Sequence, residues 1–293
     1  MKNMSHLSSC ACARTHAQEN CVPIEELEKQ IEFAVKLIRK AAAQHDYTIA
    51  FSGGKDSVVL AHLAKLAGVT MPLVYNSTTI DPPGTIAFVE KSGASIIRPK
   101  RTFLQLIEAK GLPTMFKRFC CAELKEQFIS PFLMVGIRKA ESVKRNKRYC
   151  DFELERTYPK SNVTMQLLPM LHFTDETIDY IVKRDSLQCH PLYYDADGQF
   201  HVERRLGCIG CPLKSDRGRQ DFRNCPKLLR QIAIRLIRFH ISHGRTKEDA
   251  YRQLVYQLFY SNHGHTKYVN RFEGLFPDDP KRVLEDYFNI ELP

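Results

Sequence analysis

Ser52-Gly53-Gly54-Lys55-Asp56-Ser57 is the stretch that decides the fold of this 293-residue chain. It follows an apolar run, Tyr47–Phe51, and leads into an amphipathic one, Val58–Ala67, so it predicts a strand, a glycine turn and a helix start. The glycines let the backbone approach a ligand, and the helix dipole and Lys55 add positive charge. The loop therefore predicts a phosphate or pyrophosphate site, with an ordinary Gly-Gly turn as the alternative.

The composition is that of a globular protein with anionic partners. Hydrophobic residues make up 43% of the chain, and no apolar span approaches the roughly 20 residues that cross a bilayer. The polar start Met1–Asn20 lacks the apolar core of a secretory signal, so we expect a cytoplasmic protein with no membrane partner. Ten cysteines are then better interpreted as thiols or metal ligands than as disulfides. The net charge of +10 does not separate nucleotide from nucleic acid.

Alternating segments predict an α/β core, a Rossmann-like parallel sheet with helices on both faces, preceded by an amphipathic helix from Ile24 to Ala41. Ligands in such sheets bind beyond the carboxyl ends of the strands, so the Ser52 loop and Gly136-Ile137-Arg138 can face one crevice. The expected strands are Tyr47–Phe51, Met71–Tyr75, Ser95–Ile97, Phe132–Ile137 and Met165–Leu168, and the expected helices are Lys55–Ala67, Gly84–Lys91, Thr102–Lys110 and Thr174–Lys183.

We expect three parts along the chain. Residues 1–22 are a disordered or loosely attached arm without periodicity, in which Cys10, Cys12 and Cys21 give a weak metal signal. Residues 23–214 form the nucleotide-binding domain. Residues 215–293, where apolar residues recur at helical spacing, form a helical C-terminal region.

Two cysteine pairs predict a metal centre: Cys120 with Cys121, and Cys208 with Cys211. A Cys-x-x-Cys pair lets two thiolates meet one metal across a tight turn, and a second pair completes four-sulfur coordination. Four such ligands suit a 4Fe-4S cluster or Zn²⁺, and free or redox-active thiols are a third possibility. Cys225 is an alternative fourth ligand, which zinc would favour because adjacent cysteines cannot both reach one small ion without strain. The isolated thiols are expected to be buried and structural: Cys150 and Cys189.

A basic segment follows the strand expected at Phe132–Ile137. Arg138 ends that strand, where its planar fork suits phosphate oxygens, and Glu141 is expected to hold Arg145 through an ion pair. A solvated charged face is the alternative, which suits Lys144 and Lys147 better than Arg138. Later cations near the second cysteine pair are candidates for a polyanion path: Arg204, Arg205, Arg217, Arg219, Arg223, Lys227 and Arg230.

Together these motifs resemble the phosphoadenosine phosphosulfate (PAPS) reductase family of the PP-loop ATP pyrophosphatase superfamily, over roughly residues 45–230. The resemblance rests on Ser52–Ser57, Thr78–Val89, Arg118–Lys125, Gly136-Ile137-Arg138 with Glu141-Ser142, Phe173–Glu176, and Pro191-Leu192-Tyr193 before Gly207-Cys208. It implies an adenine nucleotide alpha-hydrolase-like fold and an adenosine nucleotide held between the Ser52 loop and the Arg138 region. It also implies the iron-sulfur cluster found in several branches of the family.

Two differences from the sulfonucleotide reductases of this family favour ATP cleavage. Sulfonucleotide reductases typically carry their nucleophilic thiol in a C-terminal Glu-Cys-Gly-containing motif, whereas this sequence has no cysteine after Cys225. Those reductases also tend to lack the full loop, which is intact here. The resemblance therefore implies ATP-dependent adenylation of an acceptor in sulfur transfer, similar to relatives that insert sulfur into DNA or tRNA. The alternatives are reduction of PAPS or adenosine phosphosulfate with release of sulfite, and a non-catalytic nucleotide- or nucleic-acid-binding module.

In the leading hypothesis, an acceptor oxygen attacks the α-phosphorus of ATP and pyrophosphate leaves toward Lys55, while Arg138 steadies the developing charge. Asp56 helps to place Mg²⁺, or else caps the helix start. The expected partners are a nucleic-acid acceptor and a sulfur donor or thiol-reductant protein. The expected nucleotide-binding residues are Ser52, Gly53, Gly54, Lys55, Asp56, Ser57, Gly136 and Arg138.

Overall fold

The computed structural model describes residues 22–158, 163–260 and 279–293. Contacts divide the chain into two compact units. The first comprises Met1–Tyr75, Pro83–Ile97 and Phe128–Leu206, and the second comprises Asn76–Pro82, Arg98–Gln127 and Gly207–Pro293. Residues 1–21 of the expected N-terminal arm, with their three cysteines, lie outside the described residues.

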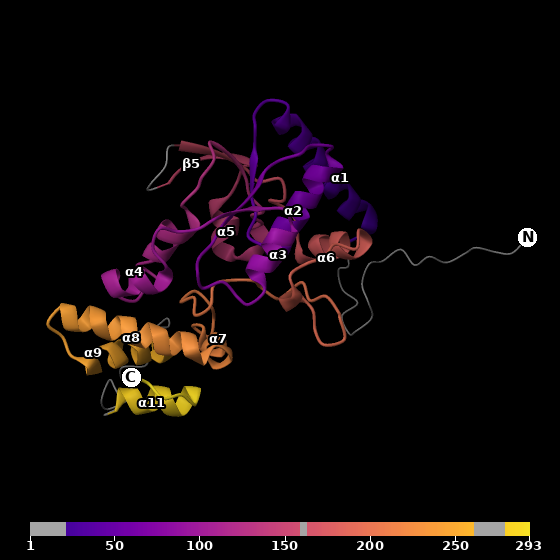
Figure 1. Ribbon diagram of the computed structural model, residues 1–293. Coiled ribbons are helices and arrows are strands. Elements are labelled where there is room, and N and C mark those ends of the chain that lie inside the picture. Colours follow the sequence, from indigo (N-terminus) through magenta and orange to yellow (C-terminus); the bar gives the residue numbers. More distant parts are fainter. Residues whose placement is uncertain (1–21, 159–162, 261–278) are drawn as a thin grey trace, which may run out of the picture. The chain divides into compact units, whose positions relative to one another are not determined.

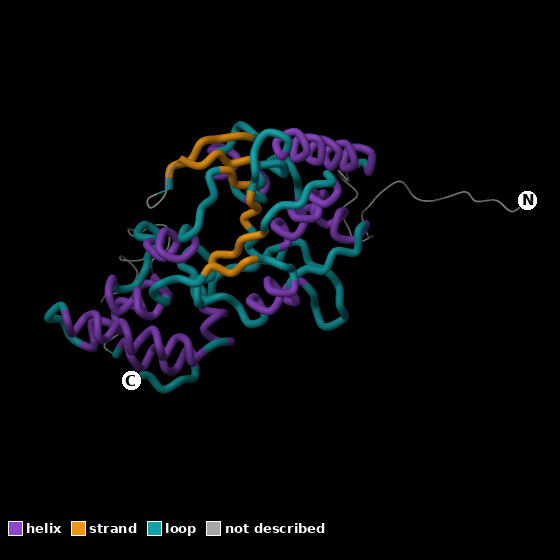
Figure 2. The backbone as a smooth tube through the Cα atoms, turned by 45° about the horizontal axis from the view of Figure 1, so that its top comes forward, coloured by secondary structure: helices purple, strands orange, loops and turns teal. Residues whose placement is uncertain are grey.

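The first unit contains a six-stranded sheet with the strand order β3-β2-β1-β4-β6-β5. Its strands are drawn in orange in Figure 2. β1 pairs in parallel with β2 and β4, and β4 pairs in parallel with β6. Ile49 of the central strand β1 faces Leu73 on one side and Met134 on the other. The strands are β1 Thr48–Ala50, β2 Leu73–Asn76, β3 Ser95–Ile97, β4 Phe132–Met134, β5 Glu153–Thr157 and β6 Val163–Leu167.

The α/β fold class expected from the sequence is confirmed, with one correction to the sheet. β5 was not predicted, and it pairs antiparallel with β6, so the sheet is mixed rather than wholly parallel. β5 lies at the sheet edge and has exposed Glu153, Glu155 and Thr157 alternating with half-buried residues, which gives it no apolar run to detect. The strand expected over Phe132–Ile137 ends at Met134.

Helices α1 Ile24–Ala42, α2 Lys55–Leu66 and α6 Asp175–Arg184 pack around a core shared with β1, β4 and β6 (Figure 1). The predicted stripe of α1 is confirmed, since Leu27, Ile31, Ala34, Ile38 and Ala41 are buried. The first unit also contains α3 Thr85–Lys91, the 3-10 helices η2 Lys139–Glu141 and η3 Pro191–Tyr193, and α5 Val143–Arg148.

The second unit is helical, as expected for the C-terminal region. α4 Phe103–Lys110 packs against α8 Pro226–Ser242, α8 against α9 Lys247–Val255, and α9 against α11 Pro280–Phe288 (Figure 1). Leu106, Leu229, Leu236, Leu254 and Leu284 lie in one core. The other helices among the described residues of this unit are α7 Arg219–Asn224 and two π-helical segments, η1 Cys121–Lys125 and η4 Tyr256–Tyr260. Across the part of the chain that the structure describes, no helix is long and apolar enough to span a bilayer.

Candidate functional site

The Ser52–Ser57 loop joins the carboxyl end of β1 to the first turn of α2, as the sequence predicts. Gly53 has φ +73°, in the left-handed region, and a Cβ built there would lie 3.3 Å from Val89 Cγ2 and 3.5 Å from Leu206 Cδ2. A side chain at this position would therefore be strained and crowded at once. The glycine is what allows the loop to pass over these apolar side chains.

The two serines of the loop fix its shape from within. Ser52 Oγ accepts from the Gly54 amide at 3.3 Å, and Ser57 Oγ donates to the Gly54 carbonyl at 2.8 Å. Gly54 is the N-cap of α2, and no side chain among the described residues caps this helix. An uncapped helix start with its positive dipole end suits an anionic ligand.

Lys55 is the cation at this helix start, and it is held in place. Its side chain is only 5% exposed, and Nζ lies 3.4 Å from Asp56 Oδ2 and 5.7 Å from the centre of the Tyr193 ring. Tyr193 Oη accepts from the Leu206 amide at 3.2 Å and from the Lys55 backbone amide. Burial raises the pKa of Tyr193, so the phenol keeps its proton. Through these contacts Tyr193 holds the loop around Lys55 in place.

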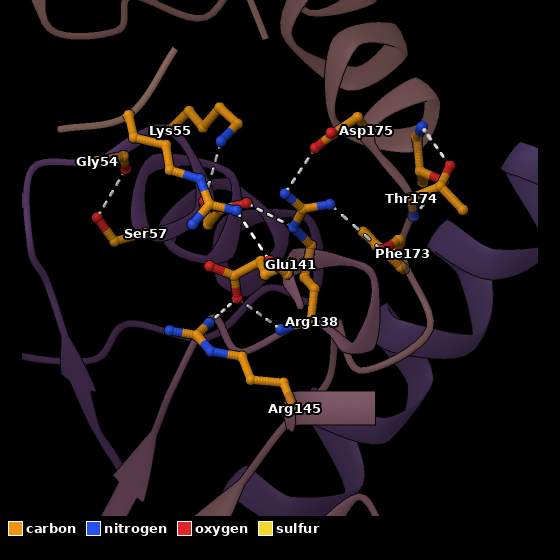
Figure 3. A network of polar contacts seen from close by, with 12 residues as sticks. Gly54, Lys55, Ser57, Arg138, Glu141, Arg145, Phe173, Thr174 and Asp175 are labelled. Carbon is orange, nitrogen blue, oxygen red and sulfur yellow. Dashed lines mark hydrogen bonds and ion pairs between the residues drawn. The ribbon is translucent and has the colours of Figure 1, made fainter. Parts of the chain in front are cut away.

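Arg138 is the most deeply buried cation of the site, with a side chain 1% exposed (Figure 3). Nε donates to Asp56 Oδ1 at 2.6 Å, Nη2 to Asp175 Oδ1 at 2.8 Å and Nη1 to the Phe173 carbonyl at 3.4 Å. Its backbone amide donates to Glu141 Oε2 at 3.1 Å. The guanidinium thereby joins the start of α2, the start of α6 and the segment after β4.

This network changes how two expected roles are understood. Both oxygens of Asp56 contact cations, Arg138 and Lys55, and Gly54 is the N-cap, so the capping alternative for Asp56 is wrong. Arg138 has protein acceptors on all three guanidinium nitrogens, so its direct role toward phosphate stays a prediction. The contacts themselves make Arg138 a positioning residue for Asp56.

Gly136 explains why these two segments come together. A Cβ at this position would lie 3.1 Å from the Asp56 carbonyl oxygen, which is tighter than most contacts between a Cβ and the backbone. The glycine therefore lets the chain after β4 lie directly against the start of α2. Arg138, two residues later, can then reach the Asp56 carboxylate.

The basic segment after β4 contains an ion pair and a solvated part, as the sequence predicts. Glu141 and Arg145 form the expected ion pair (Figure 3). Arg205 Nη2 adds a hydrogen bond to the Glu141 carbonyl at 2.9 Å. Lys144 and Lys147 are exposed, in agreement with the solvated-face interpretation.

The four candidate cysteine ligands all belong to the second unit. Cys120 and Cys121 share a hydrogen bond, which raises the pKa of Cys120 and lowers that of Cys121 to about 6. Charge on Cys208 and Cys211 also raises the pKa of Cys120. Burial by itself would lower the pKa of the Lys125 ammonium group. Negative charge on Cys208, Cys121 and Cys211 has the larger effect, so the pKa of Lys125 is raised.

The fit of a metal to these residues is incomplete. Four sulfur donors and a nearby cation match the chemistry of a cluster. Over residues 22–158, 163–260 and 279–293, however, no three His, Cys, Asp or Glu side chains are placed to hold a metal ion. Cys225 is the N-cap of α8 and packs against the helical core. Cys189 is buried as expected, whereas Cys150 is exposed, because it follows α5 in a polar turn.

The turn between Cys208 and Cys211 is tightly packed. Gly210 has φ +68°, and a Cβ there would lie 2.2 Å from the Phe222 ring. A Cβ on Gly218 would lie 2.4 Å from the Gly210 Cα. Asp221 accepts from the Gly210 amide and from Lys214 Nζ. These contacts hold the Cys-x-x-Cys turn in one conformation.

Asp175 and Tyr193 are site residues that the sequence analysis did not select. Asp175 binds the guanidinium of Arg138, and Tyr193 contacts the loop around Lys55. Both lie in motifs that carried the family resemblance, Phe173–Glu176 and Pro191-Leu192-Tyr193, and that was the available signal. Nothing in their spacing links them to the glycine loop.

The fold and the loop define a nucleotide-binding protein of the PP-loop type. The model of the phosphoadenosine phosphosulfate reductase domain matches residues 46–214, which is more than half of the chain. The chain therefore belongs to this family.

The relative reported next has low sequence identity to this chain. An uncharacterized protein of Methanocaldococcus jannaschii is 24% identical over an alignment of 209 residues, and the match covers 67% of this chain and 49% of the relative. The chain thus spans about half the length of that curated protein.

Two solved structures are similar at low sequence identity. PAPS reductase from Candida auris, in a phosphate complex, has a TM-score of 0.44 and 12% identity, covering 67% of this chain and 98% of that one. Candida glabrata FMN adenylyltransferase, in complex with FMN and the ATP analogue AMPCPP, has a TM-score of 0.45 and 17% identity, covering 64% of this chain and 63% of that one.

Proposed function

We propose that this protein is an ATP-dependent adenylating enzyme that activates an acceptor for sulfur transfer. The observation that carries the proposal is the intact loop, with buried Lys55 at the uncapped start of α2 and at the carboxyl end of a central strand. Nucleotides bind beyond the carboxyl ends of parallel strands such as β1, β2 and β4. Membership of the family supports an adenosine nucleotide as the ligand.

In the proposed reaction an acceptor oxygen forms a bond to the α-phosphorus of ATP. The bond from that phosphorus to the bridging oxygen breaks, the electron pair leaves with pyrophosphate, and the acceptor proton passes to water. Lys55 and the amides at the start of α2 stabilise the negative charge of the departing pyrophosphate. A sulfur nucleophile from the donor then attacks the activated acceptor atom and displaces AMP.

Mg²⁺ enters this reaction with its nucleotide, as Mg·ATP. Asp56 has one oxygen 2.6 Å from Arg138 Nε and the other 3.4 Å from Lys55 Nζ, so it does not fit a free metal ligand. Its contacts instead fix Lys55 relative to Arg138. Arg138 orients Asp56, and Asp175 and the Phe173 carbonyl hold Arg138.

The direct test is pyrophosphate release from Mg·ATP, with total tRNA, denatured DNA or no added acceptor. We expect Lys55→Ala to lower the rate about 100-fold, as removal of one charge-stabilising donor does in other enzymes. Lys65→Ala is the matched control, because Lys65 is exposed in the last turn of the same helix. Equal rates in wild type and Lys55→Ala would contradict the proposal, as would sulfite release from PAPS without any pyrophosphate release from ATP.

The sulfur-transfer part of the proposal includes a metal centre at Cys120, Cys121, Cys208 and Cys211, either a 4Fe-4S cluster or Zn²⁺. Its support is the sequence motif, a Cys-Cys pair and a Cys-x-x-Cys pair that belong to one compact unit, and the turn of the second pair, which Asp221 holds through the Gly210 amide. No step of the adenylation depends on this centre.

The metal centre is tested by anaerobic purification, a visible spectrum, and iron, sulfide and zinc analysis. We expect about one cluster or one zinc ion per chain, and its loss in Cys211→Ser. Cys150→Ser is the control, since Cys150 is exposed and outside the set. A colourless wild type free of iron and zinc would remove the metal centre and leave the adenylation proposal standing.

A further inference from the structure

A cavity in the first unit plays no part in the proposed reaction. It has a volume of about 300 Å³ and lies against the first turns of α1, the segment before β5 and the segment after β6. Such a volume is at the lower end of the range for ligand pockets, so it suits a group the size of one nucleoside.

Aromatic side chains form its wall. The Phe33 and Phe152 rings have centroids 5.0 Å apart, and the Phe152 and His172 rings have centroids 5.3 Å apart. Phe33 is 50% exposed, although the opposite stripe of α1 is buried in the core. Burial, and then the charge of Lys139, lower the pKa of His172, so its ring is neutral at pH 7. A planar ligand can therefore stack on an uncharged, partly exposed aromatic surface.

Polar groups at the same cavity would bind the rest of a nucleotide. Lys29 lines it as an exposed cation, and Glu26, one turn earlier in α1, lines it as an exposed carboxylate. Gln30 also lines it, and its amide oxygen accepts from Thr177 Oγ1 at 3.1 Å, so the amide NH₂ is the group left to donate. One donor for a base edge, the Lys29 ammonium for a phosphate and the Glu26 carboxylate as an acceptor for a sugar hydroxyl match the chemistry of a nucleotide.

We propose that this cavity is a second nucleotide site, which binds one base by stacking on Phe33 and its phosphate through Lys29. The site goes beyond the proposed reaction and does not depend on it. The ligand is either a free mononucleotide or one nucleotide of a single strand, since both present the same base and phosphate. Phe173 lines the cavity and its carbonyl accepts from Arg138, so a bound base would lie beside the Arg138 network.

The test uses the absence of tryptophan from the chain. Phe33→Trp would give the protein a single fluorophore at the cavity, to be titrated with AMP, UMP and the oligonucleotides dT₈ and rU₈. We expect saturable quenching. Quenching by mononucleotides alone would identify a free nucleotide as the ligand. Binding of an oligonucleotide at least tenfold tighter than that of a mononucleotide would identify a single strand as the ligand. Ile241→Trp is the control, because Ile241 is 58% exposed on α8 in the other unit and should show none.

Binding without the reporter is measured by equilibrium dialysis of labelled AMP. Phe33→Ala and Lys29→Gln should each weaken it about tenfold, as loss of one stacking or charge contact does. Lys36→Gln, exposed on the same helix outside the cavity, should leave it unchanged. All nucleotide effects should persist in Lys55→Ala. Their disappearance there would assign them to the glycine loop and overturn the second site, as would no quenching at Phe33→Trp or unchanged affinity in both cavity variants.

Discussion

We expect Arg138→Ala to weaken ATP binding strongly and to lower the free energy of unfolding, and we expect Lys147→Ala to leave both nearly unchanged. Arg138 is buried and binds two carboxylates and a carbonyl, and its removal leaves Asp56 without the partner 2.6 Å away. Breaking a buried ion pair from one side costs about 3–5 kcal/mol. The lower end applies here, because the Asp175 side chain is 56% exposed and can be solvated. Lys147 is an exposed residue of α5.

Urea unfolding and titration with a fluorescent ATP analogue measure the two effects. Arg138→Lys is an informative third variant, because a single ammonium group cannot reproduce the planar fork that bridges Asp56, Asp175 and Phe173. It should recover only part of the stability and little of the binding. Equal losses in Arg138→Ala and Lys147→Ala would mean that the region acts only as a positively charged surface.

Gly218→Ala should destabilise the second unit far more than Gly244→Ala, although both glycines are in the left-handed region, at φ +79° and +70°. A Cβ on Gly218 would lie 2.4 Å from the Gly210 Cα, whereas a Cβ on Gly244 has no atom within 4 Å. The left-handed conformation alone costs an L-residue about 1–2 kcal/mol. The backbone clash at Gly218 adds about 1–3 kcal/mol, since no flexible side chain can give way.

Thermal unfolding of the two variants, followed by circular dichroism, measures this difference. Gly218→Ala should also lower any metal content of the purified protein, because it displaces the turn between Cys208 and Cys211. Gly244→Ala should keep it. Identical unfolding midpoints would show that the loop from Cys208 to Arg219 relaxes without loss of stability. Its close packing would then contribute nothing to the free energy of unfolding.

Much of the fold was predictable because its signals are local. The apolar run before Ser52, the helical stripe of α1 and the segments around β2, β3 and α4 each carry their own periodicity, and the structure confirms them with shifts of one or two residues at most ends. β5 was missed because an edge strand with one solvated face has no continuous apolar run. Its pairing with β6 is decided by partners elsewhere in the chain.

The site was predictable in its loop and less so in its contacts. The glycines, the serines and Lys55 indicate an anion site, because they provide the backbone geometry and the positive charge that such a site needs. The placement of Arg138 between Asp56 and Asp175 joins residues 82 and 37 positions apart, which no local pattern reveals. The same limit applies to the aromatic cavity, whose members come from α1 and from two later segments.

The interleaving of the two units along the sequence constrains how this protein can be cut or grafted. Leu106 and Ile107 of α4 are fully buried in the same core as α8, which begins more than a hundred residues later. A fragment ending at residue 214 would keep α4 and lose the helix that covers it, exposing those leucine and isoleucine side chains to water. Domain swaps with relatives should therefore exchange Arg98–Gln127 together with the C-terminal helices.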